Sequence, residues 1–192
     1  MGANDIARWT RDYYPVFDRE GLVIDVRNNN GGNIDSWILG KLLRRHWFYW
    51  QPRVGRPFGN MPFAFRGRMC VLVNERTVSD GEAFAEGFRR LGLGKVVGNR
   101  TLGGEIWLSA DNFLVDRGIA TAAESGVFGL EEAWIIEQHG VDPDVTVENL
   151  PRATFDGADA QLESAVRLLL DDLQKNPLPK ITTPKYPVKA VR

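Results

Sequence analysis

The stretch from residue 69 to residue 94 constrains the fold of this chain more than any other. It begins with the apolar run CVLV, residues 70–73, which is long enough for a buried strand and too short for a helix. A polar bend follows, and after Ser79 apolar residues recur at helical spacing. Glu82, three residues after Ser79, completes the S-x-x-E pattern of a capping box. The sequence therefore predicts a strand, a turn that presents Ser79, and a helix.

Ser79 has two interpretations at such a turn. As a helix N-cap, its hydroxyl would accept a hydrogen bond from a backbone N–H and contribute ~1 kcal/mol. As a nucleophile, it would lie beside the unpaired N–H groups of a helix start, which stabilise developing negative charge. Because S-x-x-E is common at helix starts, this stretch alone favours the N-cap.

A second strand-and-turn unit precedes this stretch. The run GLVIDV, residues 21–26, suits the interior of a largely parallel sheet. Gly31 and Gly32 follow it in a polar turn, and a helix is expected over residues 34–45. Glycine turns at the carboxyl ends of parallel strands are where open α/β sheets usually bind ligands.

A third strand is expected over residues 95–98, before a second glycine pair, Gly103 and Gly104. Three strands alternating with helices predict an α/β layer with right-handed crossovers. Between residues 106 and 136, short apolar stretches alternate with glycine and acidic residues, which indicates antiparallel strands or extended loops.

The remaining segments frame this layer. A helix is expected over residues 6–17, and an amphipathic helix with a stripe of leucines over residues 156–176. The aromatic cluster HWFYWQP, residues 46–52, includes Trp50 and is interpreted as core, interface or one wall of a cleft. Residues 1–176 are expected to form one domain, and residues 177–192 an extended or disordered tail.

Composition excludes several classes of function. The net charge of −1 gives no pervasive basic field for nucleic acid. Cys70 is the single cysteine, and the two histidines are His46 and His139, so disulfides, thiolate clusters and multi-histidine metal sites are not expected. No apolar run approaches the ~20 residues that span a membrane. We expect neither a cofactor nor a metal.

Four motifs occur in an order that resembles one family. LVIDVRNNNGG, VNERTVSDGEAF, VVGNRTLGGE and WIIEQHGVDPDV are similar to the tail-specific and tricorn branches of the serine peptidases of family S41. The resemblance runs from about residue 14 to residue 173. It implies the α/β fold called ClpP/crotonase-like, peptide or unfolded-protein substrates, and a possible homo-oligomer. A cytoplasmic location is expected, with a periplasmic location as the alternative.

The resemblance also implies roles for individual residues. Ser79 matches the nucleophilic serine of the family, and the backbone N–H groups of Gly32 and Asp80 match its oxyanion hole. Glu137 matches the glutamate of a Ser–His–Ser–Glu tetrad, which orients the histidine through a second serine. Four ordered motifs reverse the preference for the N-cap, and Ser79 is predicted to be a nucleophile.

The general base is the missing part of this assignment. One branch of the family uses a lysine after the third strand, but residues 99–105 contain none, and Arg100 does not deprotonate at working pH. The tricorn-like branch carries its histidine upstream, before a PDZ-like domain. We therefore expect the chain to be the C-terminal part of a larger protease, inactive alone.

Three alternatives stay open. His139, two residues from Glu137, is a less favoured base, and His46 is less favoured still. The chain could instead be a catalytically inert peptide-binding or assembly module that keeps the fold. An acyl-CoA enzyme is a weaker alternative, because crotonase folds also place paired backbone N–H groups on a carbonyl, but the Ser79-Asp80-Gly81 motif argues against it.

Overall fold

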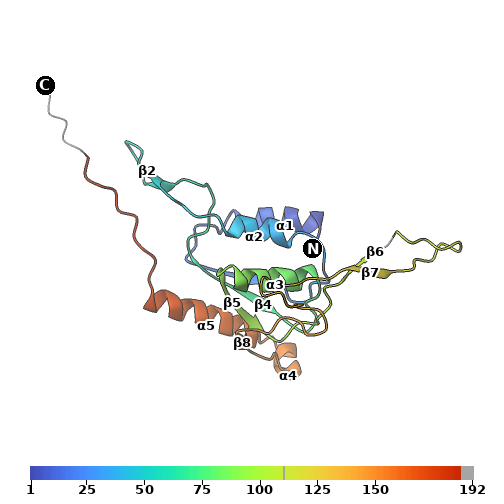
Figure 1. The fold of residues 1–192 in the computed structure, drawn as a ribbon. Coiled ribbons are helices and arrows are strands. Elements are labelled where there is room, and N and C mark those ends of the chain that lie inside the picture. Colours follow the sequence, from blue (N-terminus) through green and yellow to red (C-terminus); the bar gives the residue numbers. More distant parts are fainter. Residues whose placement is uncertain (110, 187–192) are drawn as a thin grey trace.

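A four-stranded parallel sheet forms the centre of the molecule, in the order β1–β4–β5–β8 (Figure 1). This computed structural model describes residues 1–109 and 111–186. The strands are β1 (Gly21–Asp25), β4 (Arg68–Val73), β5 (Gly94–Gly98) and β8 (Val145–Thr146). In the register, Val71 of β4 pairs with Ile24 on one side and Val96 on the other. The three strands expected from the apolar runs are confirmed, and β8 was not predicted.

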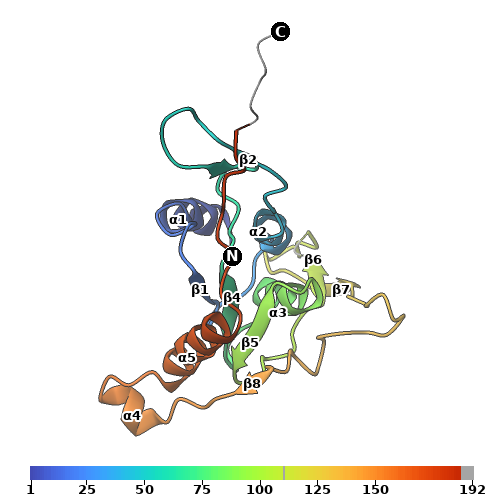
Figure 2. The ribbon, with the colours of Figure 1, turned by 90° about the vertical axis from the view of Figure 1, so that its left-hand side faces the viewer.

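Helices cover both faces of the sheet (Figures 1 and 2). One face carries α1 (Ala3–Tyr13), α2 (Asp35–Leu42) and α3 (Asp80–Arg90), and the other carries α5 (Ala160–Lys175), which follows the short α4 (Pro151–Phe155). This is the α/β fold that the sequence predicts.

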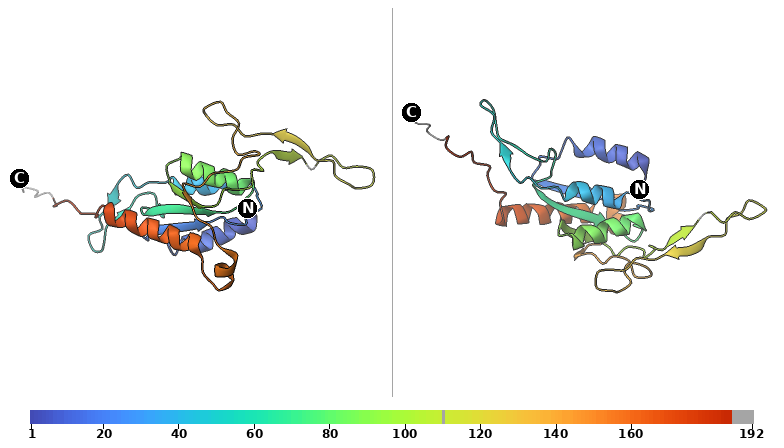
Figure 3. Two further views of the ribbon diagram at one scale, coloured as in Figure 1. Left: turned by 90° about the horizontal axis from the view of Figure 1, so that it is seen from below. Right: turned by 45° about the horizontal axis from the view of Figure 1, so that its top comes forward.

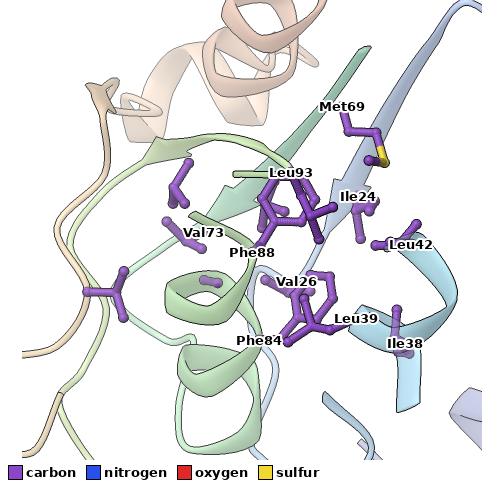
Figure 4. Close-up of a cluster of buried hydrophobic side chains, with 14 of the residues drawn as sticks. Ile24, Val26, Ile38, Leu39, Leu42, Met69, Val73, Phe84, Phe88 and Leu93 are labelled. Atoms are coloured by element: carbon purple, nitrogen blue, oxygen red, sulfur yellow. The ribbon is translucent and has the colours of Figure 1, made fainter. Parts of the chain in front are cut away.

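After Arg68, strand β4 is apolar and buried because it has a core on each side. Its residues Val71 and Val73 belong to the larger core, where Phe84 and Phe88 of α3 are fully buried (Figure 4). The alternate residue Leu72 points to the smaller core beneath α5. A strand that is buried on both faces reads as a continuous apolar run, which explains why it was recognisable in the sequence.

Two antiparallel ribbons project from this body (Figure 3). Strands β2 (Tyr49–Trp50) and β3 (Phe58–Gly59) form one hairpin, and β6 (Trp107–Ser109) pairs with β7 (Ala122–Ser125) in the other. The second ribbon contains a register shift after Trp107 and is extended by two isolated bridges. The antiparallel strands expected between residues 106 and 136 are thus present, although they are short.

Three expectations need correction. The helix predicted over residues 156–176 begins four residues later, as α5 at Ala160, because Gly157 adopts a φ of +95° between α4 and α5. Within α5, Leu162, Val166 and Leu170 are exposed, because Ala165 and Leu169 face the sheet. The first helix ends at Tyr13, four residues before its predicted end. Residues 177–186 form neither helix nor strand, and the remainder of the expected tail, 187–192, lies outside the described residues.

Within the described ranges, no helix has the length and apolarity needed to cross a bilayer.

Candidate active site

The loops that follow β1, β4 and β5 meet at the carboxyl edge of the sheet. The Val78 N–H donates to the Asn29 carbonyl oxygen at 2.8 Å, and the Leu102 N–H donates to the Thr77 carbonyl oxygen at 3.1 Å. Asn28 and Asn74 also join the first two loops, since the side-chain amide of Asn74 accepts from the Asn28 N–H and donates to the Asn28 side chain. Parallel strands bring these loops together because their carboxyl ends share one edge.

Ser79 occupies a strained turn between β4 and α3. Its φ of 55° and ψ of −124° lie outside the regions that ordinary residues favour, at a cost of roughly 1–3 kcal/mol. Across the described residues, its hydroxyl makes no cap hydrogen bond to the helix. The Glu82 N–H donates instead to the Ser79 backbone carbonyl oxygen. The hydroxyl therefore does not serve as the helix cap, and it is available for other chemistry.

Glu82 performs the capping in place of Ser79. Its carboxylate accepts the Ser79 N–H at 2.9 Å and is fully buried. It also accepts from the Thr101 hydroxyl, from the Gly103 N–H at 2.7 Å and from the Gly104 N–H at 2.9 Å. One carboxylate thus holds the second glycine turn against the start of α3. The capping-box pattern predicts the first of these bonds, but no sequence pattern predicts the other three.

The first glycine turn lies directly against Ser79. Gly31 has a φ of +98°, and a Cβ there would lie 2.9 Å from the Ser79 Cβ and 3.2 Å from its Oγ. Gly32 has a φ of +154°, and a Cβ there would overlap the backbone of Met1. The Met1 carbonyl oxygen accepts a hydrogen bond of 3.0 Å from the backbone N–H of Asn33, the residue after Gly32. Only glycine satisfies both the backbone angles and the close approach.

Asp80 joins this turn to α3 through its side chain. Its carboxylate accepts from the N–H groups of Ile34 (2.9 Å) and Asp35 (3.2 Å), which begin α2. Burial raises the pKa of Asp80 above its ordinary value. Within residues 1–109 and 111–186, the backbone N–H groups of Gly32 and Asp80 donate to no acceptor. One predicted oxyanion donor, the Asp80 N–H, therefore follows Ser79 directly, and the glycine turn that carries the other packs against Ser79 through Gly31.

Glu137 lies in the same group of loops but does not reach Ser79 by a hydrogen bond among the described residues. Its Oε2 accepts the N–H of Glu105 at 2.8 Å and that of Ile106 at 2.9 Å. Its neighbours Ile136 and Gln138 have positive φ values of 71° and 63°. Such a φ is a genuine outlier for a β-branched residue such as Ile136. Backbone strain of this kind gathers at functional sites, although it does not assign a role.

Glu105 is a partly buried acid that the sequence did not single out. One of its carboxyl oxygens, Oε2, is buried and has no hydrogen-bond partner among the described residues. Burial, together with the nearby carboxyls of Glu82, Asp80, Asp35 and Glu137, raises the pKa of Glu105 to about 8. This acid therefore titrates near neutral pH. Its position directly after a glycine pair was the only signal available beforehand.

Neither histidine contacts Ser79 through a hydrogen bond in the described part of the chain. The Nε2 atom of His139 lies 2.7 Å from a carboxylate oxygen of Asp142, and the imidazole is 62% exposed. His46 lines a cavity with Gly67 and Gly94, at the amino ends of β4 and β5, and so lies at the opposite edge of the sheet. No group of three or more His, Cys, Asp or Glu side chains in the described ranges is arranged to hold a metal ion.

Comparison with known proteins identifies relatives of this chain. The family model for peptidase family S41 matches residues 3–147. Tricorn protease of Thermoplasma acidophilum is 34% identical over 167 residues, which cover 85% of this chain and 16% of that protein. Tricorn protease homolog 1 of Streptomyces coelicolor is 38% identical over 177 residues, which cover 92% of this chain and 17% of the homolog. The chain therefore spans about a sixth of these relatives.

Solved structures share the fold as well. The crystal structure of the tricorn protease superposes with a TM-score of 0.83 at 32% identity, covering 88% of this chain and 16% of that one. The photosystem II D1 C-terminal processing protease has a TM-score of 0.56 at 22% identity, with 88% and 44% covered, and shows a shared fold. The chain belongs to peptidase family S41, and it is a tricorn-like domain of that family.

Proposed function

We propose that this chain carries the nucleophile and the oxyanion hole of a serine endopeptidase. The observation that supports this most strongly is the environment of Ser79. Its backbone is held in a strained conformation, its hydroxyl caps nothing among the described residues, and the Gly31 backbone approaches it so closely that a Cβ there would clash. The unused N–H groups belong to Asp80, which follows Ser79, and to Gly32, which follows Gly31. A merely structural helix cap would require none of these features.

The geometry supports an ordinary acyl-transfer sequence. The Ser79 Oγ attacks the carbonyl carbon of a peptide bond, and its proton passes to a base. The carbonyl oxygen becomes negative and accepts hydrogen bonds from the N–H groups of Gly32 and Asp80. Removing one such donor typically costs about 2.7–4 kcal/mol of transition-state stabilisation. The leaving amine takes the proton from the base, and water then hydrolyses the acyl-enzyme.

The base in this proposal is a histidine from a segment upstream of the chain. Glu137 uses one carboxylate oxygen on the Glu105 and Ile106 N–H groups, and its other oxygen would orient the incoming histidine through a serine. The substrates would be peptides or unfolded proteins, because the relatives named above are proteases.

Hydrolysis of a fluorogenic peptide tests the proposal. We expect negligible hydrolysis by the 192-residue chain. A longer protein that carries a histidine-bearing segment ahead of the same chain should hydrolyse the peptide and lose this activity with Ser79→Ala. Ser125→Ala, at an exposed position on β7, is the matched control and should leave the activity unchanged. Ser79-dependent hydrolysis by the short chain would refute the upstream base and favour His139.

A second candidate function is an inert peptide-binding or assembly module. It is favoured by one observation, namely that neither His46 nor His139 contacts Ser79 in the described residues. Under this alternative, the longer protein would bind peptides without cleaving them, and Ser79→Ala would leave the binding unchanged.

A further inference from the structure

The nucleophile and one of its oxyanion donors lie on different loops, and side chains join these loops. Ser79 and the Asp80 N–H follow β4, whereas the Gly32 N–H follows β1. The alignment of the Gly32 donor with the Ser79 hydroxyl therefore depends on contacts between the two loops. Asn74, the first residue after β4, makes two of these contacts through its side-chain amide.

The amide group of Asn74 uses both its oxygen and its nitrogen. Its Oδ1 accepts the Asn28 N–H at 3.0 Å, and its Nδ2 donates to the Asn28 Oδ1 at 3.1 Å. The same Oδ1 accepts the Arg76 N–H at 3.1 Å, as asparagine side chains do in turns. Asn28 has a φ of 59°, a left-handed conformation in which asparagine is enriched. This pair therefore joins the start of the first loop to the start of the second.

Thr77 fixes Asn74 from the buried side of the same turn. Its side chain is fully buried. Its hydroxyl donates to the Val26 carbonyl oxygen at 3.1 Å and accepts the Asn74 N–H at 3.1 Å. The Thr77 N–H also donates to the Asn74 carbonyl oxygen at 2.9 Å. Because Val26 directly follows β1, these bonds hold Asn74 at one place against the first loop.

The contacts continue from this junction to the site. Asn29 accepts the Val78 N–H with its carbonyl oxygen at 2.8 Å, and its side chain accepts the Gly31 N–H at 2.9 Å. Gly31 in turn packs so closely against Ser79 that a Cβ there would lie 2.9 Å from the Ser79 Cβ. A shift at the start of the first loop would therefore move Gly32, which follows Gly31.

We infer that Asn74 is a positioning residue, whose side-chain amide sets the alignment of the Gly32 oxyanion donor with Ser79. This inference rests on the proposed function. Asparagine suits the position because one amide group supplies both an acceptor for the Asn28 N–H and a donor for the Asn28 Oδ1. Alanine supplies neither. A misplacement of about 1 Å in a reacting site can cost on the order of 100-fold in rate.

Steady-state kinetics of the longer protein described above test this inference, with active sites counted by complete reaction with a fluorophosphonate. Asn74→Ala should lower kcat per labelled site by about ten- to hundredfold, because the Gly32 donor moves. KM should stay within about twofold, because no substrate contact is removed. A merely structural residue would change the number of labelled sites and leave kcat per site unchanged.

The conservative variant Asn74→Asp should recover most of kcat. Its carboxylate still accepts the Asn28 N–H, and the Asn28 amide can turn its NH₂ group toward the second oxygen. Asn99→Ala is the matched control, because Asn99 directly follows β5 at the same edge of the sheet. The Asn99 side chain makes no hydrogen bond within residues 1–109 and 111–186, so this variant should leave kcat unchanged.

Three kinetic results would overturn the inference and leave the proposed function intact. One is an unchanged kcat per site in Asn74→Ala. Another is an Asn74→Asp variant as slow as Asn74→Ala. The third is a raised KM with an unchanged kcat, which would indicate a substrate contact instead of positioning.

A second measurement tests the loop contact without any activity. In the 192-residue chain, Asn74→Ala should shift the NMR amide resonance of Gly32, whereas Asn99→Ala should not. A longer protein that hydrolyses no peptide would refute the proposed function and this inference with it. An active longer protein, combined with a Gly32 resonance that Asn74→Ala leaves unmoved, would overturn this inference alone.

Discussion

Replacing Glu82 by Gln tests how Ser79 is held in place. The carboxylate is fully buried and serves four donors, two on each oxygen. A glutamine retains one oxygen, and its NH₂ group replaces the other. If NH₂ takes the place of Oε2, it faces the N–H groups of Ser79 and Gly104; if it takes the place of Oε1, it faces the Gly103 N–H and the Thr101 hydroxyl. In either orientation, at least one buried N–H loses its acceptor.

The magnitude follows from these contacts. One buried unsatisfied donor costs about 1–3 kcal/mol, and each remaining bond loses the additional strength of a charged acceptor. We expect Glu82→Gln to lower the free energy of unfolding by about 2–4 kcal/mol. Urea unfolding followed by tryptophan fluorescence measures this change, and the denaturant slope should stay constant.

The matched control is Glu163→Gln on the exposed side of α5. A surface substitution of this kind usually changes the free energy of unfolding by less than about 0.5 kcal/mol. If Glu82→Gln also stays within about 0.5 kcal/mol of the wild type, the carboxylate does not hold the two loops together, and Ser79 is positioned by other contacts.

Three other substitutions probe the same region and the core. Gly31→Ala should destabilise the chain and displace Ser79, because the alanine Cβ would lie 2.9 Å from the Ser79 Cβ. NMR chemical shifts of residues around Ser79 would report the displacement, and unchanged shifts would contradict this prediction. The pKa of Glu105 is about 8 in the folded state against an ordinary value of 4.5, so the folded state binds more protons between these two pH values. Stability should therefore fall as pH rises from about 4.5 to about 8. Glu105→Gln should flatten this fall when melting temperature is measured against pH, and an unchanged slope would show that Glu105 is not the group that titrates. Phe84→Ala removes a fully buried ring and should cost about 3–5 kcal/mol in urea unfolding, whereas a loss below about 1 kcal/mol would place the ring outside the core.

The sheet and its loops were accessible from the sequence because they depend on local patterns. Strand β4 is buried and strands β1 and β5 are partly buried, so they appear as apolar runs, and each is followed by a turn that contains glycine or Ser79. The two glycine pairs were recognisable, and in three of their four positions, Gly31, Gly32 and Gly103, a side chain is not tolerated. At Gly31 the obstacle is Ser79, and at Gly103 the φ of +92° also favours glycine.

The parts that could not be predicted depend on contacts between distant segments. Glu82 has the sequence pattern of a local cap, but its three other donors come from the loop after β5. The buried oxygen of Glu105 results from the packing of several loops, which no single motif encodes. Whether Ser79 caps the helix is decided by its φ of 55°, and that angle is a property of the folded turn.

Covalent labelling measures the role of Ser79 most directly. A longer protein that carries a histidine-bearing segment ahead of this chain would be treated with a fluorophosphonate, and the adduct located by mass spectrometry. We predict one adduct, on the peptide that contains Ser79, which Ser79→Ala abolishes and Ser125→Ala leaves intact. An adduct on another serine, or labelling that survives Ser79→Ala, would contradict the assignment of Ser79 as the nucleophile.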